Sequence, residues 1–203
     1  MKVPNERHVA RPWRVHELAA DFDLLDVWQF EIDGAQADFP RFVDLHAGLL
    51  GAEGESTTGA AGLLFRLRHW LGDVFGWDEG AALPIPGCAE TRVADRLPEE
   101  ARLAPGGGAF EPVYFDDAEC LHEISNQTVH ALMHMGWVQT PTGYAPEMAV
   151  YVKPRGFFGR AYMGLIDPFR HWIVYPALMK QVKRQWAATR AVPVPDAGPA
   201  AAL

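Results

Sequence analysis

The chain has 203 residues, of which 49% are hydrophobic and 22% charged, and its formal net charge is −8. A globular chain of this size buries a core without needing disulfides or a structural metal. The acidic balance disfavours binding to the phosphate backbone of nucleic acids. No membrane span and no signal peptide are expected, because charges interrupt the longest apolar stretch and the N-terminus is polar. Cys88 and Cys120 do not form a paired motif and fit reduced thiols in a cytoplasmic protein.

The first half of the chain predicts one strand and two helices. Residues 1–12 look like a flexible arm, and residues 26–32 alternate between apolar and polar side chains as a β-strand does. Asp38, followed by a phenylalanine and a proline, marks a helix start. Apolar residues at helical spacing predict helices over 39–50 and 58–75.

A segment rich in glycine and proline follows over 76–112, with a short helical turn expected at 98–102. So long an irregular segment is typical of a lid or binding loop, or it is a plain surface connection. After it come the predicted strands, which cover residues 111–116, 119–125, 128–138 and 145–153.

The strand predicted over 128–138 carries two different faces, because side chains alternate along a strand. The more apolar face holds Val129, Ala131, Met133, Met135 and Trp137. The other face holds Thr128, His130, Leu132, His134 and Val138. We expect the apolar face to meet the C-terminal helix.

Residues 157–186 predict a long, unusually apolar helix, with a break at Asp167 and Pro168 and a kink at Pro176. A helix this apolar does not suit the surface, so we expect the strands to wrap around it. The predicted fold class is α+β, a single domain over 13–188 in which a curved antiparallel sheet encloses this helix. The tail over 189–203 is rich in proline and alanine and is predicted to be disordered.

Several segments carry a family resemblance. They are EISNQTVHALMHMGWV (123–138), MAVYVKPRG (148–156), GRAYMGLIDPFRHWIVYPALM (159–179), GCAETRVADRLPEE (87–100) and DFDLLDVWQF (21–30). Together they resemble a bacterial family catalogued as domain of unknown function 2867, over most of residues 12–187. That family looks like a relative of the helix-grip superfamily, which includes polyketide cyclases and START-like and Bet v1-like lipid-transfer domains. The resemblance therefore implies a helix-grip fold, and it supplies no established catalytic residues.

Three histidines, His122, His130 and His134, raise the question of a metal site. On a strand, His130 and His134 share a face but lie about 13 Å apart. Two imidazoles that bind one zinc ion at ~2.1 Å each cannot span that distance. We therefore expect neither a metal nor a cofactor at these histidines.

His130 and His134 have two interpretations. They are polar groups on an outer face or in an oligomer contact, or they are general acid–base groups that line a pocket together with Glu123. Glu119 and Glu147 are likewise either solvated strand positions or members of an acid–base pair. No motif for nucleophilic catalysis is present in the sequence.

A ligand site is predicted between the sheet and the C-terminal helix. Its expected residues are Trp137, Met133, Met135, Tyr162, Arg170, His171 and Tyr175. The last three either anchor a ligand at the cavity mouth or form internal hydrogen bonds to the sheet or to Asp167.

The leading functional hypothesis from the sequence is a non-enzymatic binding module for a small apolar or amphipathic molecule. One alternative is an enzyme of the cyclase or isomerase type that uses His130 or His134 with Glu123. Another is a homo-oligomeric interaction protein, such as a homodimer, that pairs through the sheet face bearing His130, Leu132 and His134.

Overall fold

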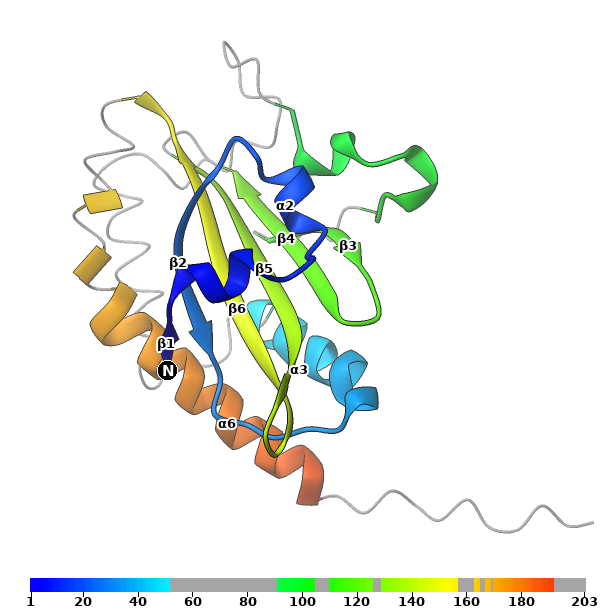
Figure 1. Cartoon of the computed structure of the whole chain (residues 1–203), viewed down its shortest axis with the longest axis vertical. Helices are drawn as coiled ribbons and strands as arrows, with labels where there is room; N and C mark the ends of the chain where they lie inside the picture. The colour runs from blue at the N-terminus through cyan, green and yellow to red at the C-terminus, as the bar shows by residue number, and fades with distance from the viewer. Residues whose placement is uncertain are drawn as a thin grey trace, which may run out of the picture.

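The computed structural model describes residues 1–51, 91–104, 110–125, 129–156, 163–164, 167–168 and 170–191. At its centre is a curved six-stranded antiparallel sheet with the strand order β1-β2-β6-β5-β4-β3 (Figure 1). The strands are β1 (Lys2–Val3), β2 (Asp23–Gln29), β3 (Glu111–Phe115), β4 (Glu119–Ser125), β5 (Val129–Thr140) and β6 (Gly143–Pro154). The helices are α1 (Asn5–Val9), α2 (Val15–Leu18), α3 (Phe39–Gly51) and α6 (Tyr175–Ala191). Shorter helical turns are η1 (Gln36–Asp38), η2 (Val93–Arg96), η3 (Glu99–Ala101) and the π-helical η4 (Arg170–Val174).

Strands β3 to β6 confirm the strands predicted for the second half of the chain. β5 and β6 pair without interruption from Val129 opposite Pro154 to Thr140 opposite Gly143. Gly143 closes this hairpin with a φ of 148°, a backbone conformation that favours glycine. β2 begins earlier than predicted, at Asp23, because its register is set by pairing with β6 and not by its own alternation.

Helix α3 confirms the helix predicted over 39–50. Asp38 belongs to the turn η1 that precedes it, and its carboxylate accepts a hydrogen bond from the backbone N–H of Ala35 at 2.8 Å. The expected turn at 98–102 is present as η3. The helix predicted over 58–75 lies outside the described residues, as do much of the segment 76–112 and the tail beyond Ala191.

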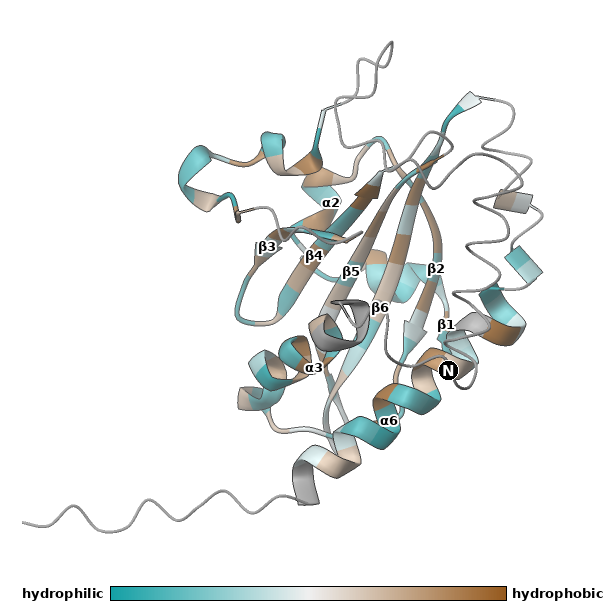
Figure 2. Cartoon of the chain, turned by 180° about the vertical axis from the view of Figure 1, so that it is seen from behind, coloured by the Kyte–Doolittle hydropathy of each residue, from teal (hydrophilic) through white to brown (hydrophobic). Residues whose placement is uncertain are grey.

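Both faces of the sheet are covered (Figures 1 and 2). Met133, Met135 and Trp137 of β5 pack with residues of α3 and α6 in one apolar layer, which confirms the predicted partner of this face. On the other face, Leu132 packs beneath α2 and η2 in a second apolar layer. β5 therefore contributes to two cores, one from each set of its alternating side chains.

Helix α6 lies along one face of the sheet. Val182 and Trp186 are buried, whereas Lys180 and Lys183 are exposed, so the helix has one apolar stripe. The curved antiparallel sheet and the C-terminal helix are thus confirmed, and α6 is amphipathic instead of apolar all round. That the sheet wraps the helix as in a helix-grip fold stays a prediction. The π-helical turn η4 runs directly into α6, and Pro176 lies at this junction, where a proline removes an intrahelical N–H donor.

The flexible arm predicted for residues 1–12 is instead an ordered part of the fold. Lys2 and Val3 form β1, paired with β2, and α1 then lies over the sheet face opposite α6 (Figure 1). His8, within α1, is 0% exposed. No helix among the described residues has the length and apolar character needed to cross a membrane.

Truncation of Trp186 tests how α6 is held on the sheet. Trp186 is 3% exposed, and its ring centre lies 6.1 Å from that of Trp137. Because Trp186→Ala leaves a cavity, we expect the free energy of unfolding to fall by about 3–5 kcal/mol. Trp172→Ala is the matched control: this ring is 81% exposed, and its loss should change stability by less than about 0.5 kcal/mol. Chemical denaturation measures both, and equal effects would contradict this placement of the helix.

Candidate functional site

The sheet face beneath α1 and α2 carries polar side chains that are buried. They are Glu119, Glu123, His130, His134 and Glu147, and none is more than 8% exposed. Buried groups of this kind need hydrogen-bond partners within the protein. The interpretation of these residues as solvated strand positions is therefore wrong. The homo-oligomer alternative also loses its surface, because α1, α2 and η2 of the same chain cover this face.

Glu119 has several hydrogen-bond donors around it. Its Oε2 accepts from the hydroxyl of Tyr114 at 2.6 Å and from Nε2 of His134 at 2.8 Å, and its Oε1 accepts from the backbone N–H of Arg14 at 2.9 Å. Burial raises the pKa of Glu119, but these hydrogen bonds together outweigh burial and lower that pKa below its usual value. Glu119 is therefore an ionised carboxylate at neutral pH.

His134 is a neutral imidazole next to that carboxylate. Burial lowers the pKa of His134 to about 4, although its hydrogen bond to Glu119 acts in the opposite direction. Since Nε2 donates to Glu119, Nδ1 is left as an acceptor, and it is buried without a hydrogen-bond partner among the residues that the structure describes. The hypothesis that paired His134 with Glu123 is thus corrected: its carboxylate partner is Glu119.

His8 joins this network from α1. Its Nδ1 lies 3.0 Å from Oε1 of Glu147, and its Nε2 lies 3.0 Å from the hydroxyl of Tyr151, which also reaches Nδ1 of His16 at 3.1 Å. The ring centre of His8 is 5.1 Å from that of His134. Burial raises the pKa of Glu147. The hydrogen bond from His8 and the positive charges nearby act in the opposite direction, and together they lower the pKa of Glu147 below its usual value. The network therefore couples the N-terminal segment to two strands.

A second histidine and carboxylate pair lies farther along β4 and β5. Oε2 of Glu123 lies 3.3 Å from Nε2 of His130 and accepts a hydrogen bond from the backbone N–H of Val93 at 2.7 Å. Oε1 of Glu123 accepts from the guanidinium of Arg92, also at 2.7 Å. The predicted proximity of Glu123 and His130 is confirmed, and the pair attaches η2 to the sheet.

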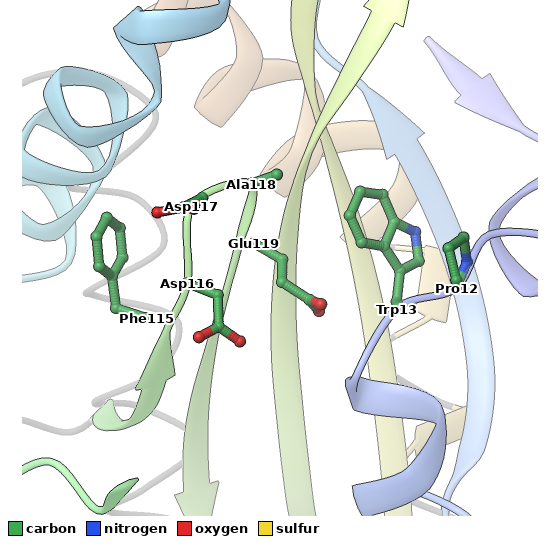
Figure 3. Close-up of a pocket in the computed structure, with 7 residues that line it drawn as sticks. All are labelled: Pro12, Trp13, Phe115, Asp116, Asp117, Ala118 and Glu119. Atoms are coloured by element: carbon green, nitrogen blue, oxygen red, sulfur yellow. The ribbon is translucent and has the colours of Figure 1, made fainter.

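A pocket of about 530 Å³ opens beside Glu119 (Figure 3). It lies between the segment before α2 and the β3–β4 turn, and we call it the rim pocket. Its lining residues are Pro12, Trp13, Phe115, Asp116, Asp117, Ala118 and Glu119. Figure 3 shows the carboxylates of Asp116 and Glu119 between the rings of Phe115 and Trp13. The sequence did not single out this pocket, because its two halves come from distant segments.

On the opposite face, the predicted ligand anchors form an internal ion-pair group. The guanidinium of Arg170 donates to Asp26 at 2.9 Å and to the hydroxyl of Tyr175 at 3.0 Å, and Nε2 of His171 lies 3.3 Å from Asp26. These contacts match the alternative of internal hydrogen bonds to the sheet. Asp26, the buried partner, was not singled out in the sequence.

The same group has the spacing of a metal site. Ligand atoms of Asp26, Asp167 and His171 lie within 4.8 Å of one another. The guanidinium of Arg170, however, lies 2.9 Å from Asp26 and 3.5 Å from Asp167 and already offsets their charge. Arg170 therefore takes the place that a cation would have here.

The remaining residues of the predicted ligand site are core residues or lie outside the description. Met133, Met135 and Trp137 are buried in the layer that faces α3 and α6, and Tyr162 is outside the described residues. The rim pocket and a second pocket of about 300 Å³ near the β5–β6 turn both lie elsewhere. A ligand between the sheet and α6 thus stays a prediction.

The fold and this site define an α+β protein whose sheet is buried on both faces and carries a histidine and carboxylate network beside a pocket. A family model described as protein of unknown function (DUF2867) matches residues 18–177, and the chain belongs to that family. No curated protein and no solved structure matches the chain. His8 and Trp13 precede the matched region, so the N-terminal part of the network lies outside it.

The pH dependence of stability tests the neutral state of His134. Its pKa falls from an ordinary 6.5 to about 4 in the folded protein. Between these values the unfolded chain binds a proton that the folded chain does not, so the free energy of unfolding decreases as the pH drops from 6.5 to 4. His134→Gln keeps a donor for Glu119 but does not titrate. Between pH 6.5 and 4 the free energy of unfolding of this variant should therefore decrease less than that of the wild type, by up to about 3 kcal/mol. Urea denaturation across the interval measures this, and identical profiles for the two proteins would contradict it.

Proposed function

We propose that this protein is a binding module for a small, positively charged molecule with an apolar part, held in the rim pocket. The observation that carries this proposal is the lining, which combines the rings of Trp13 and Phe115 with three carboxylates. The volume of about 530 Å³ is within the range of small-molecule sites.

The charges around the pocket favour a cationic ligand. Asp116 is paired with Arg14 at 3.3 Å, whereas Asp117 is exposed and has no ion-pair partner among the described residues. Glu119 is ionised and bound by donors that are neutral. One arginine thus faces three carboxylates, and a bound cation would offset the remaining negative charge. Aromatic faces beside such a site add cation–π attraction.

The proposal keeps the small-molecule binding inferred from the sequence but moves it away from α6. A helix-grip relationship is the second part of the proposal. In its support, helix α3 follows β2, the later strands return so that β6 pairs with β2, and α6 ends the described chain. The expectation of an amphipathic ligand is retained, with its charged end now specified.

Benzyltrimethylammonium is a suitable probe of the rim pocket. We expect calorimetry to detect its binding and to find neutral benzyl alcohol roughly tenfold weaker, because charge and cation–π attraction are lost. Asp117→Asn should weaken binding of the cation roughly two- to fivefold, as expected for an exposed charge. Asp44→Asn, which removes the same charge from the exposed side of α3, should leave the affinity unchanged. Two results would contradict the proposal: equal affinities for the cation and the alcohol, or an affinity for the cation that Asp117→Asn leaves unchanged.

The pair of His134 and Glu119 favours a second candidate function. In this alternative the protein is an enzyme that removes a proton from a ligand in the same pocket. A neutral imidazole with a free acceptor nitrogen, oriented by a carboxylate, is a general-base arrangement. Glu119 connects His134 to the rim pocket, because it lines the pocket and accepts a hydrogen bond from His134. A pocket ligand that is recovered chemically unchanged after prolonged incubation would exclude this alternative.

A further inference from the structure

We infer that His46 of α3 and His122 of β4 together form a binding site for a transition-metal ion of the zinc and copper class. The site lies on the sheet face that packs against α3. It is independent of the rim pocket and of the network around His134, since neither histidine belongs to them.

The two rings come together through ordinary helix and strand geometry. Phe42 and His46 are one helical turn apart on the buried stripe of α3. His122 alternates with the glutamates of β4 and therefore points to the opposite face, toward α3. The ring centres of His46 and His122 lie 6.3 Å apart with planes tilted by 54°. Imidazole nitrogens bind zinc at about 2.0–2.1 Å, and the separation of the ring centres suits one ion held between the two rings.

Each ring has a buried nitrogen for which the described part of the chain provides no hydrogen-bond partner. These atoms are Nε2 of His46 and Nδ1 of His122. Leaving a buried polar atom unpaired costs roughly 1–3 kcal/mol, and a metal ion bound by two such atoms on neighbouring rings would remove this cost for both. Phe42 stacks on His46 at 5.9 Å and 26° and so holds the plane of that ring.

The charge state of both rings suits coordination. Burial, with a further contribution from His122, lowers the pKa of His46 to about 3, and burial also lowers the pKa of His122. Both imidazoles are therefore neutral at pH 7, which is the form that binds metals. Two neutral nitrogen donors select zinc, copper or nickel over calcium and magnesium, which prefer oxygen ligands.

The experiment uses full-length protein without a histidine tag, stripped with chelator, and Zn²⁺ and Co²⁺ as the probes. We expect calorimetry to find one Zn²⁺ per chain at this site, and the visible spectrum of bound Co²⁺ to report nitrogen coordination. His46→Gln and His122→Gln should each weaken binding at least tenfold, whereas His16→Gln, which removes an imidazole on the other face, should not. Affinity should fall as the pH is lowered, since protons compete for the same nitrogens.

Circular dichroism in the presence of chelator checks that each variant folds. If His46→Gln does not fold, His122→Gln decides the question, because His122 is less buried. The inference is overturned if the wild-type protein binds neither ion, or if a folded His122→Gln variant binds Zn²⁺ as tightly as the wild type. Failure here would leave the cation proposal for the rim pocket unaffected, because that site contains neither histidine.

Discussion

The buried contact between His8 and Glu147 joins the N-terminal segment to β6, and we expect the arrangement of this face to depend on it. Removal of a carboxylate from water costs several kcal/mol unless a partner compensates, and Glu147 is fully buried with His8 at 3.0 Å. With α1 in place, the following residues bring Trp13 over β5. A Cβ atom on Gly136 would lie only 2.7 Å from the ring of Trp13, so this close approach requires glycine. Trp13 then forms one wall of the rim pocket.

The two faces of the sheet differ in chemistry although the same strands build both. On the α6 side, methionine and aromatic side chains fill the layer, with the pair of Asp26 and Arg170 as a buried polar group. On the α1 side, histidines and glutamates are linked by hydrogen bonds that leave few alternatives for side-chain placement. Apolar burial on the first face favours stability, and polar pairing on the second favours a defined arrangement next to the pocket.

Local patterns in the sequence were sufficient for much of the fold. The strands after residue 110, the two faces of β5 and the helix α3 follow from alternation and helical spacing, which neighbouring residues determine. The N-terminal segment was mistaken for a flexible arm because it is short and polar, and the pairing of β1 with β2 and the burial of His8 depend on residues far along the chain. The apolar character of residues 157–186 suggested an enclosed helix, but a single stripe on α6 meets the sheet.

The candidate sites required information that spacing does not contain. Strand register places His134 opposite Leu121, with Glu119 and Glu123 two residues away on either side, so register alone does not choose its partner. In the structure His134 binds Glu119, whereas Glu123 is occupied by His130 and Arg92. The rim pocket joins Trp13 to the β3–β4 turn, and the metal site joins His46 to β4, so each depends on contacts between distant segments. Family membership does not replace this information, since the family description assigns no function.

A double-mutant cycle on His8 and Glu147 tests most directly whether this contact holds the N-terminal segment in place. The free energies of unfolding of His8→Ala, Glu147→Ala and the double variant are compared with that of the wild type at neutral pH. We expect each single change to cost about 3–5 kcal/mol, and the double variant to lose less than the sum of the two by at least about 1.5 kcal/mol. Effects that add to within about 0.5 kcal/mol would mean that the two residues do not interact and that another contact holds α1 on the sheet.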